Sequence, residues 1–109
     1  FITGAPTREE LETVMGDWDA MGLDVAITEL DIPTVEDDQD AHAAQYADVV
    51  AACLAVDACV EVTLWGFTDR HTWLDDFLGP GSTPLLFDED YDPKPAYDAV
   101  AETLAGAVE

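Results

Sequence analysis

The sequence predicts an α/β fold in which helices pack against parallel strands. Two stretches, Leu23–Pro33 and Val60–Phe67, are mostly apolar over the length of a strand, and each follows a stretch with apolar residues at helical spacing. Helix, strand, helix, strand with short connections indicates a right-handed parallel unit, as in doubly wound sheets and (β/α)8 barrels. The 109 residues suffice for one small domain or part of a larger one, so length does not distinguish these folds.

The first helix is predicted from Thr7, which forms a T-x-x-E capping box with Glu10, to Gly22, which closes the helix. Its apolar residues recur at helical spacing: Leu11, Val14, Met15, Trp18 and Met21. An aromatic residue in such a stripe is more often core than a ligand platform, so we expect Trp18 to be buried.

A carboxylate stands near the end of the first strand. The strand period of two places Val25, Ile27, Glu29 and Asp31 on one face. The other face is also mostly apolar, which favours a parallel sheet covered on both sides, with ligands at the carboxyl ends of its strands. An ionised Glu29 facing inward there costs desolvation energy unless it has partners, so it is a candidate functional residue. The alternative is a strand-end Glu turned to solvent.

The acidic stretch Val35–Asp40 invites comparison with a calcium site, but it lacks the Gly and the bidentate Glu spacing of an EF-hand loop. We expect instead a solvated loop that leads into the next helix. That helix is predicted over about 40–56 from apolar residues at helical spacing, while His42 near its start is uninformative.

Cys53 and Cys59 are separated by five residues that turn from helix to strand. A disulfide can close this span and would contribute about 2 kcal/mol. The alternatives are two buried thiols of an intracellular protein and, ranked last, a metal site, which needs more ligands and another spacing. We predict no metal and no cofactor.

Two tryptophans lie near the carboxyl end of the second strand. Trp65 ends the strand and Trp73 lies in the loop after it, so both can reach the mouth that holds Glu29. Aromatic rings near a carboxylate suit a carbohydrate cleft, because they bury the C–H faces of sugars. His71 is a candidate for a hydrogen bond to a sugar. The alternative, that the indoles fill the core, is reasonable for Trp65 and weaker for Trp73, whose neighbours are polar.

Roughly thirty residues of loop follow the second strand, which is unusual and predicts a functional rim. Pro95 then opens a last helix that carries Tyr97, Val100 and Leu104.

The chain is strongly acidic. Three Lys and Arg against 25 Asp and Glu give a formal net charge of -22, while 49% of the residues are hydrophobic. A core is available, but nucleic acid and anionic membranes need a cationic patch, so we expect neither partner. No apolar run reaches the length of a transmembrane helix. Acidic residues in every segment, with Lys almost absent, indicate adaptation to high salt, where cations screen the self-repulsion.

Three stretches together resemble the C-terminal part of the glycoside hydrolase family 10 xylanases. They are ITELDIP at 27–33, VTLWGFTDRHTWL at 62–74 and PLLFDEDYDPKPAYDAV at 84–100. TELD and WGFTD are short, but in this order, with the paired Cys and the D-x-x-Y-x-P-K-P-A-Y ending, they are highly specific. The resemblance implies the C-terminal portion of a (β/α)8 TIM barrel, from the last helix before strand seven through helix eight. Residues 1–109 would then be part of a glycoside hydrolase catalytic domain.

The resemblance also implies roles for single residues. Glu29 takes the place of the family's nucleophile, and Asp31 the place that holds a His beside it. Trp65 and Trp73 take the places of indoles that line the sugar site next to the scissile bond.

Cys53 and Cys59 match a disulfide of many secreted members. We therefore expect a secreted, monomeric, halophilic endo-β-1,4-xylanase acting on xylan or xylo-oligosaccharides, with its signal outside this chain. The family's acid/base Glu and the Gln-x-His that supports the nucleophile are outside it too. Retaining hydrolysis needs two carboxyl groups about 5 Å apart, so the 109 residues alone should be inactive, and their open sheet edges should make them fold poorly.

Three other functions stay open. A non-catalytic relative would keep the Trp platform for xylan binding without an acid/base Glu upstream. Another retaining (β/α)8 glycosidase would prefer a different β-glycan, such as glucan or mannan. An intracellular acidic binding protein, from a separate class, predicts free thiols at Cys53 and Cys59.

Overall fold

The computed structural model describes residues 6–108. The elements follow in the order α1 (Arg8–Ala20), β1 (Val25–Leu30), α2 (Gln39–Ala55), β2 (Cys59–Leu64), the 3-10 helix η1 (Asp69–His71), α3 (Leu74–Leu78) and α4 (Pro95–Ala107). This order confirms the predicted helix, strand, helix, strand unit and the last helix opened by Pro95. None of the helices within residues 6–108 is long and apolar enough to cross a membrane.

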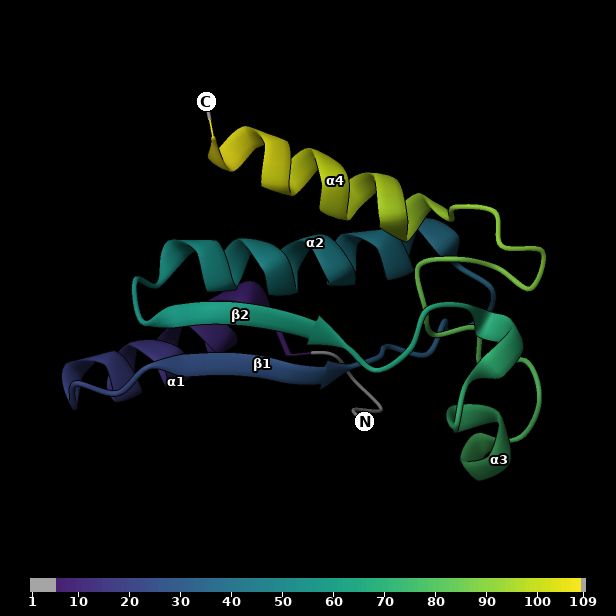
Figure 1. Ribbon diagram of the computed structural model, residues 1–109, viewed down its shortest axis with the longest axis horizontal. Coiled ribbons are helices and arrows are strands. Elements are labelled where there is room, and N and C mark those ends of the chain that lie inside the picture. Colours follow the sequence, from purple (N-terminus) through teal and green to yellow (C-terminus); the bar gives the residue numbers. More distant parts are fainter. Residues whose placement is uncertain (1–5, 109) are drawn as a thin grey trace.

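The two strands are parallel, and both arrowheads in Figure 1 point to the same end of the molecule. α2 makes the crossover between them and contacts α1, β2 and α4. The loops and the short α3 lie beyond the arrowheads, at the carboxyl ends of both strands (Figure 1). The arrangement therefore places the long loop after β2 beside the end of β1.

The described helices cover one face of the sheet. Val25 and Ile27 pack against residues of α1 and α2 in two adjoining clusters, whereas Ala26 and Thr28 between and after them are exposed. The prediction that β1 is covered on both faces is therefore wrong for residues 6–108, because these residues supply helices to one side of the two strands only.

α1 begins as predicted but is less buried than predicted. Thr7 and Glu10 form the capping box, and Gly22 follows the helix with a φ of 78°. Met15 is the one buried residue of the helix, and Trp18 is 43% exposed. The expectation of a core Trp18 is wrong, because α1 meets the sheet and α2 along the side of Met15 and no described element covers the rest of its apolar stripe.

The acidic stretch at 35–40 leads into α2, as expected. Asp38 is the N-cap residue, and its carboxylate accepts a hydrogen bond from the Ala41 N–H at 3.0 Å. A carboxylate at this position satisfies an otherwise unpaired N–H group and faces the positive end of the helix dipole.

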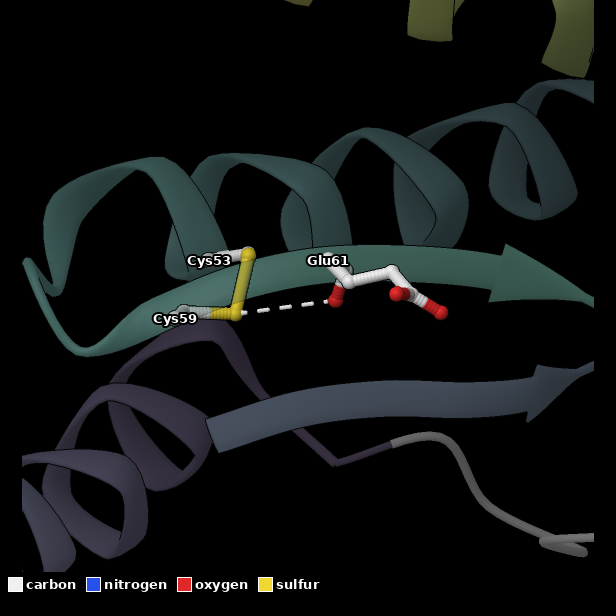
Figure 2. The surroundings of a disulfide bond; sticks show 3 residues. All are labelled: Cys53, Cys59 and Glu61. Carbon is white, nitrogen blue, oxygen red and sulfur yellow. Dashed lines mark hydrogen bonds between the residues drawn. A yellow bond between two sulfur atoms is a disulfide. The ribbon is translucent and has the colours of Figure 1, made fainter. Parts of the chain in front are cut away.

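Cys53 and Cys59 form a disulfide with their Cα atoms 5.2 Å apart, which confirms the first-ranked pairing. Figure 2 shows it joining the end of α2 to the start of β2, with the Cys59 sulfur 3.9 Å from the Glu61 carbonyl oxygen. The bond closes the turn at the amino end of β2, the end remote from the loops.

The segment between β2 and α4 is more regular than predicted. β2 ends at Leu64 and not at Phe67, because Gly66 takes a φ of 135° and turns the chain. Within the predicted loop of about thirty residues, the chain forms two short helices, η1 and α3. Isolated bridges that pair Phe87 with Thr68 and with Pro93 tie the returning chain to this loop.

Candidate active site

Glu29 is the penultimate residue of β1, at the carboxyl end of the sheet. It takes a φ of 58°, and the pairing of β1 with β2 is irregular between Ile27 and Leu30. A left-handed backbone costs a residue with a side chain about 1 kcal/mol, and a bulge in a strand re-aims the side chain it carries. The side chain is exposed and forms no hydrogen bond with any residue of 6–108. The strand therefore presents a carboxylate without a partner at its end.

Trp65 lies directly beside this strand end. Its backbone N–H donates to the Leu30 carbonyl oxygen at 2.9 Å, one residue after Glu29. The side chain is 50% exposed, which excludes the alternative of a core indole within the described chain. Trp65 thus offers an aromatic surface to solvent at the carboxyl ends of both strands.

Trp73 reaches the same place from the other side of the loop. Its indole Nε1–H donates to Asp31 Oδ2 at 2.6 Å, across 42 positions of sequence. Asp31 is 6% exposed, whereas the Trp73 side chain remains 41% exposed and contacts the ring of Phe77. The structure therefore brings the Trp73 indole to Asp31, which follows β1 and stands two positions after Glu29 in the sequence.

His71 ends η1 in the loop between the two tryptophans. Its side chain is exposed and forms no hydrogen bond with the described residues. The role of His71 toward a sugar stays a prediction.

A buried ion pair fixes the loop that carries these tryptophans, and it was not predicted from the sequence. Lys94 is 6% exposed and Asp69 is 3% exposed. The three Nζ protons of Lys94 are donated to Asp69 Oδ2 at 2.8 Å, to the Thr83 carbonyl at 2.9 Å and to the Leu85 carbonyl at 2.7 Å. An ammonium with all three donors used offsets much of the desolvation cost of its burial.

The second oxygen of Asp69 completes this network. Asp69 Oδ1 accepts the Leu85 N–H at 2.7 Å, and the Asp69 N–H donates to the Phe87 carbonyl at 2.9 Å. Leu85 also explains Gly66, since a Cβ on that glycine would lie 2.8 Å from Leu85 Cδ1. The loop after β2 is thus pinned to the chain that returns toward α4.

Residues 1–103 match the family described as "Glycosyl hydrolase family 10". The chain belongs to glycosyl hydrolase family 10.

Curated relatives in family 10 support this assignment. "Endo-1,4-beta-xylanase 1" of Humicola insolens is 34% identical over 96% of this chain and 26% of its own length. "Endo-1,4-beta-xylanase 1" of Gibberella zeae is 38% identical over 94% of this chain and 30% of its own length. The chain therefore spans roughly a quarter to a third of the curated relatives that it matches.

Solved family 10 structures share the fold. Native xylanase 10B from Thermotoga maritima superposes with a TM-score of 0.86 at 30% identity, over 95% of this chain and 34% of that one. Xylanase 10B from Thermotoga petrophila, in complex with xylobiose, gives a TM-score of 0.87 at 31% identity, over 96% and 34%. The chain has the fold of part of a (β/α)8 barrel, which confirms the barrel and decides against a doubly wound sheet.

Two of the stretches that resembled family 10 prove to be joined. The last residue of WGFTD is Asp69 and the Lys of PKPAY is Lys94, so the buried ion pair ties one motif to the other. The available sequence signal was the rarity of basic residues. Lys94 is one of only three Lys and Arg residues in a chain of net charge -22, and it stands between Pro93 and Pro95. An unpaired surface Lys is not expected there.

His42 and Tyr46 are further buried residues of this family 10 chain. His42, which we judged uninformative, is 1% exposed, and its Nε2 lies 2.7 Å from the Ile32 carbonyl oxygen. Burial, and secondarily the charge of Lys94, lowers the pKa of His42 below 6.5. Burial raises the pKa of Tyr46, whose O–H donates to the Pro84 carbonyl at 2.5 Å. Both side chains fasten α2 to the segments that follow the strands.

Residues 6–108 contain no group of three His, Cys, Asp or Glu side chains arranged to hold a metal ion.

Proposed function

We propose that this family 10 chain is part of the catalytic domain of an endo-acting retaining glycosidase that hydrolyses β-1,4-xylosidic bonds in xylan. Residues 1–109 supply the nucleophile half of its site. The curated relatives named above are endo-1,4-beta-xylanases, and one solved relative is a complex with xylobiose, which supports this substrate class. The activity belongs to the complete enzyme that contains this chain.

Glu29 is the proposed nucleophile. The observation that carries this role is its exposed, unpartnered carboxylate on a left-handed residue at the carboxyl end of β1. Strained backbone at such a position is a recurrent feature of functional sites, and barrel enzymes bind substrate at this end of their strands.

The chemistry requires a second carboxyl group from outside this chain. Glu29 attacks the anomeric carbon and forms a glycosyl ester while the acid/base group gives its proton to the leaving oxygen. That group then takes a proton from water, and the water oxygen attacks the anomeric carbon and releases Glu29. Two inversions at the same carbon keep the β configuration of the product.

The tryptophans are the proposed sugar platform. Trp65 and Trp73 remain about half exposed at the strand ends, so their rings are available to the C–H faces of xylose units, and His71 lies between them in sequence as a donor to a hydroxyl group. Asp31 is proposed to hold the His of the nucleophile site, which lies outside this chain. Oδ1 of Asp31 forms no hydrogen bond within residues 6–108 and is available for that contact.

The surroundings of the enzyme are part of the proposal. A disulfide between Cys53 and Cys59 suits an oxidising, extracellular location. The net charge of -22 suits a monomer that works in concentrated salt.

Azide rescue tests the nucleophile in the complete enzyme. Glu29→Ala should remove nearly all activity on an aryl xylobioside with a good leaving group, because no glycosyl ester can form. The cavity left by the side chain admits azide on the nucleophile's side, so one displacement should yield the α-azide, read by proton NMR. Loss of an acid/base residue would instead give the β-azide. A β product, or a variant with wild-type turnover, would show that Glu29 is not the nucleophile.

Two controls separate the remaining functions. A complete protein that binds xylan in pull-down but never hydrolyses it would be a non-catalytic relative. Faster turnover of glucan or mannan than of xylan would indicate another retaining glycosidase. Purified residues 1–109 should show no xylan hydrolysis above background, even when folded in high salt.

A further inference from the structure

The hydrogen bond between Trp73 and Asp31 joins two parts of the chain that the site needs to hold together. Trp73 Nε1 lies 2.6 Å from Asp31 Oδ2, a short distance typical of a donor bound to an ionised acceptor. Asp31 is 6% exposed and follows Glu29 by two residues, whereas the Trp73 ring remains 41% exposed. One end of the indole is therefore anchored in the protein and the face of the ring is left to solvent.

Trp65, the other indole at the strand ends, is held in place without a hydrogen bond from its side chain to any residue of 6–108. Its Nε1 forms no hydrogen bond within the described residues, and its position follows from its backbone, which pairs with Leu30. Trp73 instead precedes the short α3 and lies some distance along the loop from either strand. Its side chain ties this part of the loop to Asp31, the residue that follows β1.

We propose that Asp31 is a positioning residue for the Trp73 ring, which holds that half of the xylose platform in register with Glu29. The inference rests on the proposed function and deepens it. Oδ2 binds the indole, and Oδ1 has no partner in residues 6–108, so one carboxylate can hold the platform and still orient the nucleophile-site His. Movement of the Trp73 ring would then displace the Asp31 carboxylate and, with it, the nucleophile-site His.

Hydrogen exchange and NMR test the bond without any activity. In the complete enzyme, the Trp73 indole N–H should resonate downfield of the Trp65 indole N–H and exchange with D2O at least about tenfold more slowly, because a hydrogen bond to a carboxylate must break first. Trp73→Phe assigns the resonance. Asp31→Asn should move the Trp73 signal upfield and leave those of Trp18 and Trp65 in place. Equal exchange of Trp73 and Trp65 in the wild-type enzyme would overturn the proposal even if Asp31→Asn did not fold.

A double-mutant cycle on xylo-oligosaccharide hydrolysis tests positioning. Asp31→Asn and Trp73→Phe should each lower kcat/KM, and the loss caused by Asp31→Asn should be at least about tenfold smaller in the Trp73→Phe background, since the shared contact is already gone. The matched control is Trp65→Phe, in which Asp31→Asn should cost as much as in the wild type. Equal losses in the Trp73→Phe and Trp65→Phe backgrounds would mean that Asp31 acts on the His alone, and would overturn the proposal. An enzyme inactive on xylan would contradict the proposed function, while the exchange experiment would still decide the role of Asp31.

Discussion

Glu29 and Asp69 are both acidic residues at the carboxyl end of the sheet, one at the end of β1 and the other in the loop after β2. Glu29 is exposed, strained and without a hydrogen-bond partner among residues 6–108. Asp69 is 3% exposed and uses both carboxylate oxygens, one on Lys94 and one on the Leu85 N–H. Burial and hydrogen bonding therefore distinguish a carboxylate available to a substrate from one with a structural role: Glu29 is exposed and unpaired within residues 6–108, whereas both oxygens of Asp69 are bonded within the protein.

The largest effect expected from this contrast is on activity. Glu29→Gly in the complete enzyme should lower kcat by at least about 10,000-fold, as loss of a catalytic nucleophile does. The same change should raise the free energy of unfolding by about 1 kcal/mol, because glycine adopts a positive φ without strain. Kinetics and urea denaturation measure the two quantities.

Glu36 provides the matched control for Glu29. It is also an exposed Glu with a positive φ, 52°, but it lies in the loop before α2. Glu36→Gly should give a similar gain in stability with unchanged activity. A loss of stability in Glu29→Gly would mean that the side chain is held by contacts and is not simply presented.

The next largest effect is on the free energy of unfolding and concerns Asp69, the buried carboxylate. Lys94→Met should lower the free energy of unfolding by about 3–5 kcal/mol, because it leaves Asp69 buried without its cation. Arg8→Met removes the exposed pair with Glu12 (2.6 Å), and should cost less than about 1 kcal/mol. Similar losses in the two variants, measured by urea denaturation, would contradict the view that Lys94 and Asp69 build the rim.

The disulfide fixes the opposite end of β2. The double change Cys53→Ser and Cys59→Ser should lower stability by about 2 kcal/mol, since it frees a short loop in the unfolded chain. The xylan hydrolysis proposed for the complete enzyme should remain, because the disulfide lies at the amino end of β2 and the proposed site at its carboxyl end. Loss of activity in a variant that stays folded would show that the two ends of β2 are coupled.

Salt concentration should affect the repulsion between exposed charges but not the attraction within the buried Lys94–Asp69 pair. The Debye length falls from about 10 Å at 0.1 M to about 3 Å at 1 M, so screening should raise the melting temperature of a protein whose surface repels itself. The loss in free energy of unfolding caused by Lys94→Met should stay constant over the same range of salt, because the Lys94–Asp69 pair is buried and is therefore screened little by ions. A melting temperature that is flat or falls toward molar KCl would count against halophilic adaptation.

The smallest effect concerns His42, which lies near the same Lys94. Because its pKa is lowered in the folded state, the unfolded chain binds more protons, and stability should fall as the pH drops below 6.5 toward the folded pKa. His42→Gln should flatten this part of the stability curve. Parallel curves for the wild type and His42→Gln would show that His42 does not carry the dependence.

The elements whose signals are local were predictable. The capping box of Thr7 and Glu10, the Pro at the start of α4 and the short span between the two cysteines each involve neighbours in sequence, and each is present as expected. The place of Glu29 near the end of β1 was also predicted, since the end of an apolar strand is visible in the alternation of residue types.

Features that depend on distant partners were not predictable. Asp69 and Lys94 are 25 positions apart, and Asp31 and Trp73 are 42 apart, so no window of sequence contains either pair. The burial of Trp18 was wrongly predicted for a related reason. An apolar stripe shows which side of a helix is suited to packing, but not whether another element covers that side.

The burial of Lys94 also governs how the chain meets a protease. Trypsin binds Lys and Arg, and this chain has three such residues. Lys94 is shielded and precedes Pro95, which leaves the exposed Arg70 as the scissile position of the rim. A nick there falls between Asp69 and Lys94, yet three contacts span the break: their ion pair, the Leu85 N–H bond to the Asp69 carboxylate and the Asp69 N–H bond to the Phe87 carbonyl. After cleavage at Arg70, the two sides of this break should stay together on a native gel and separate only in detergent.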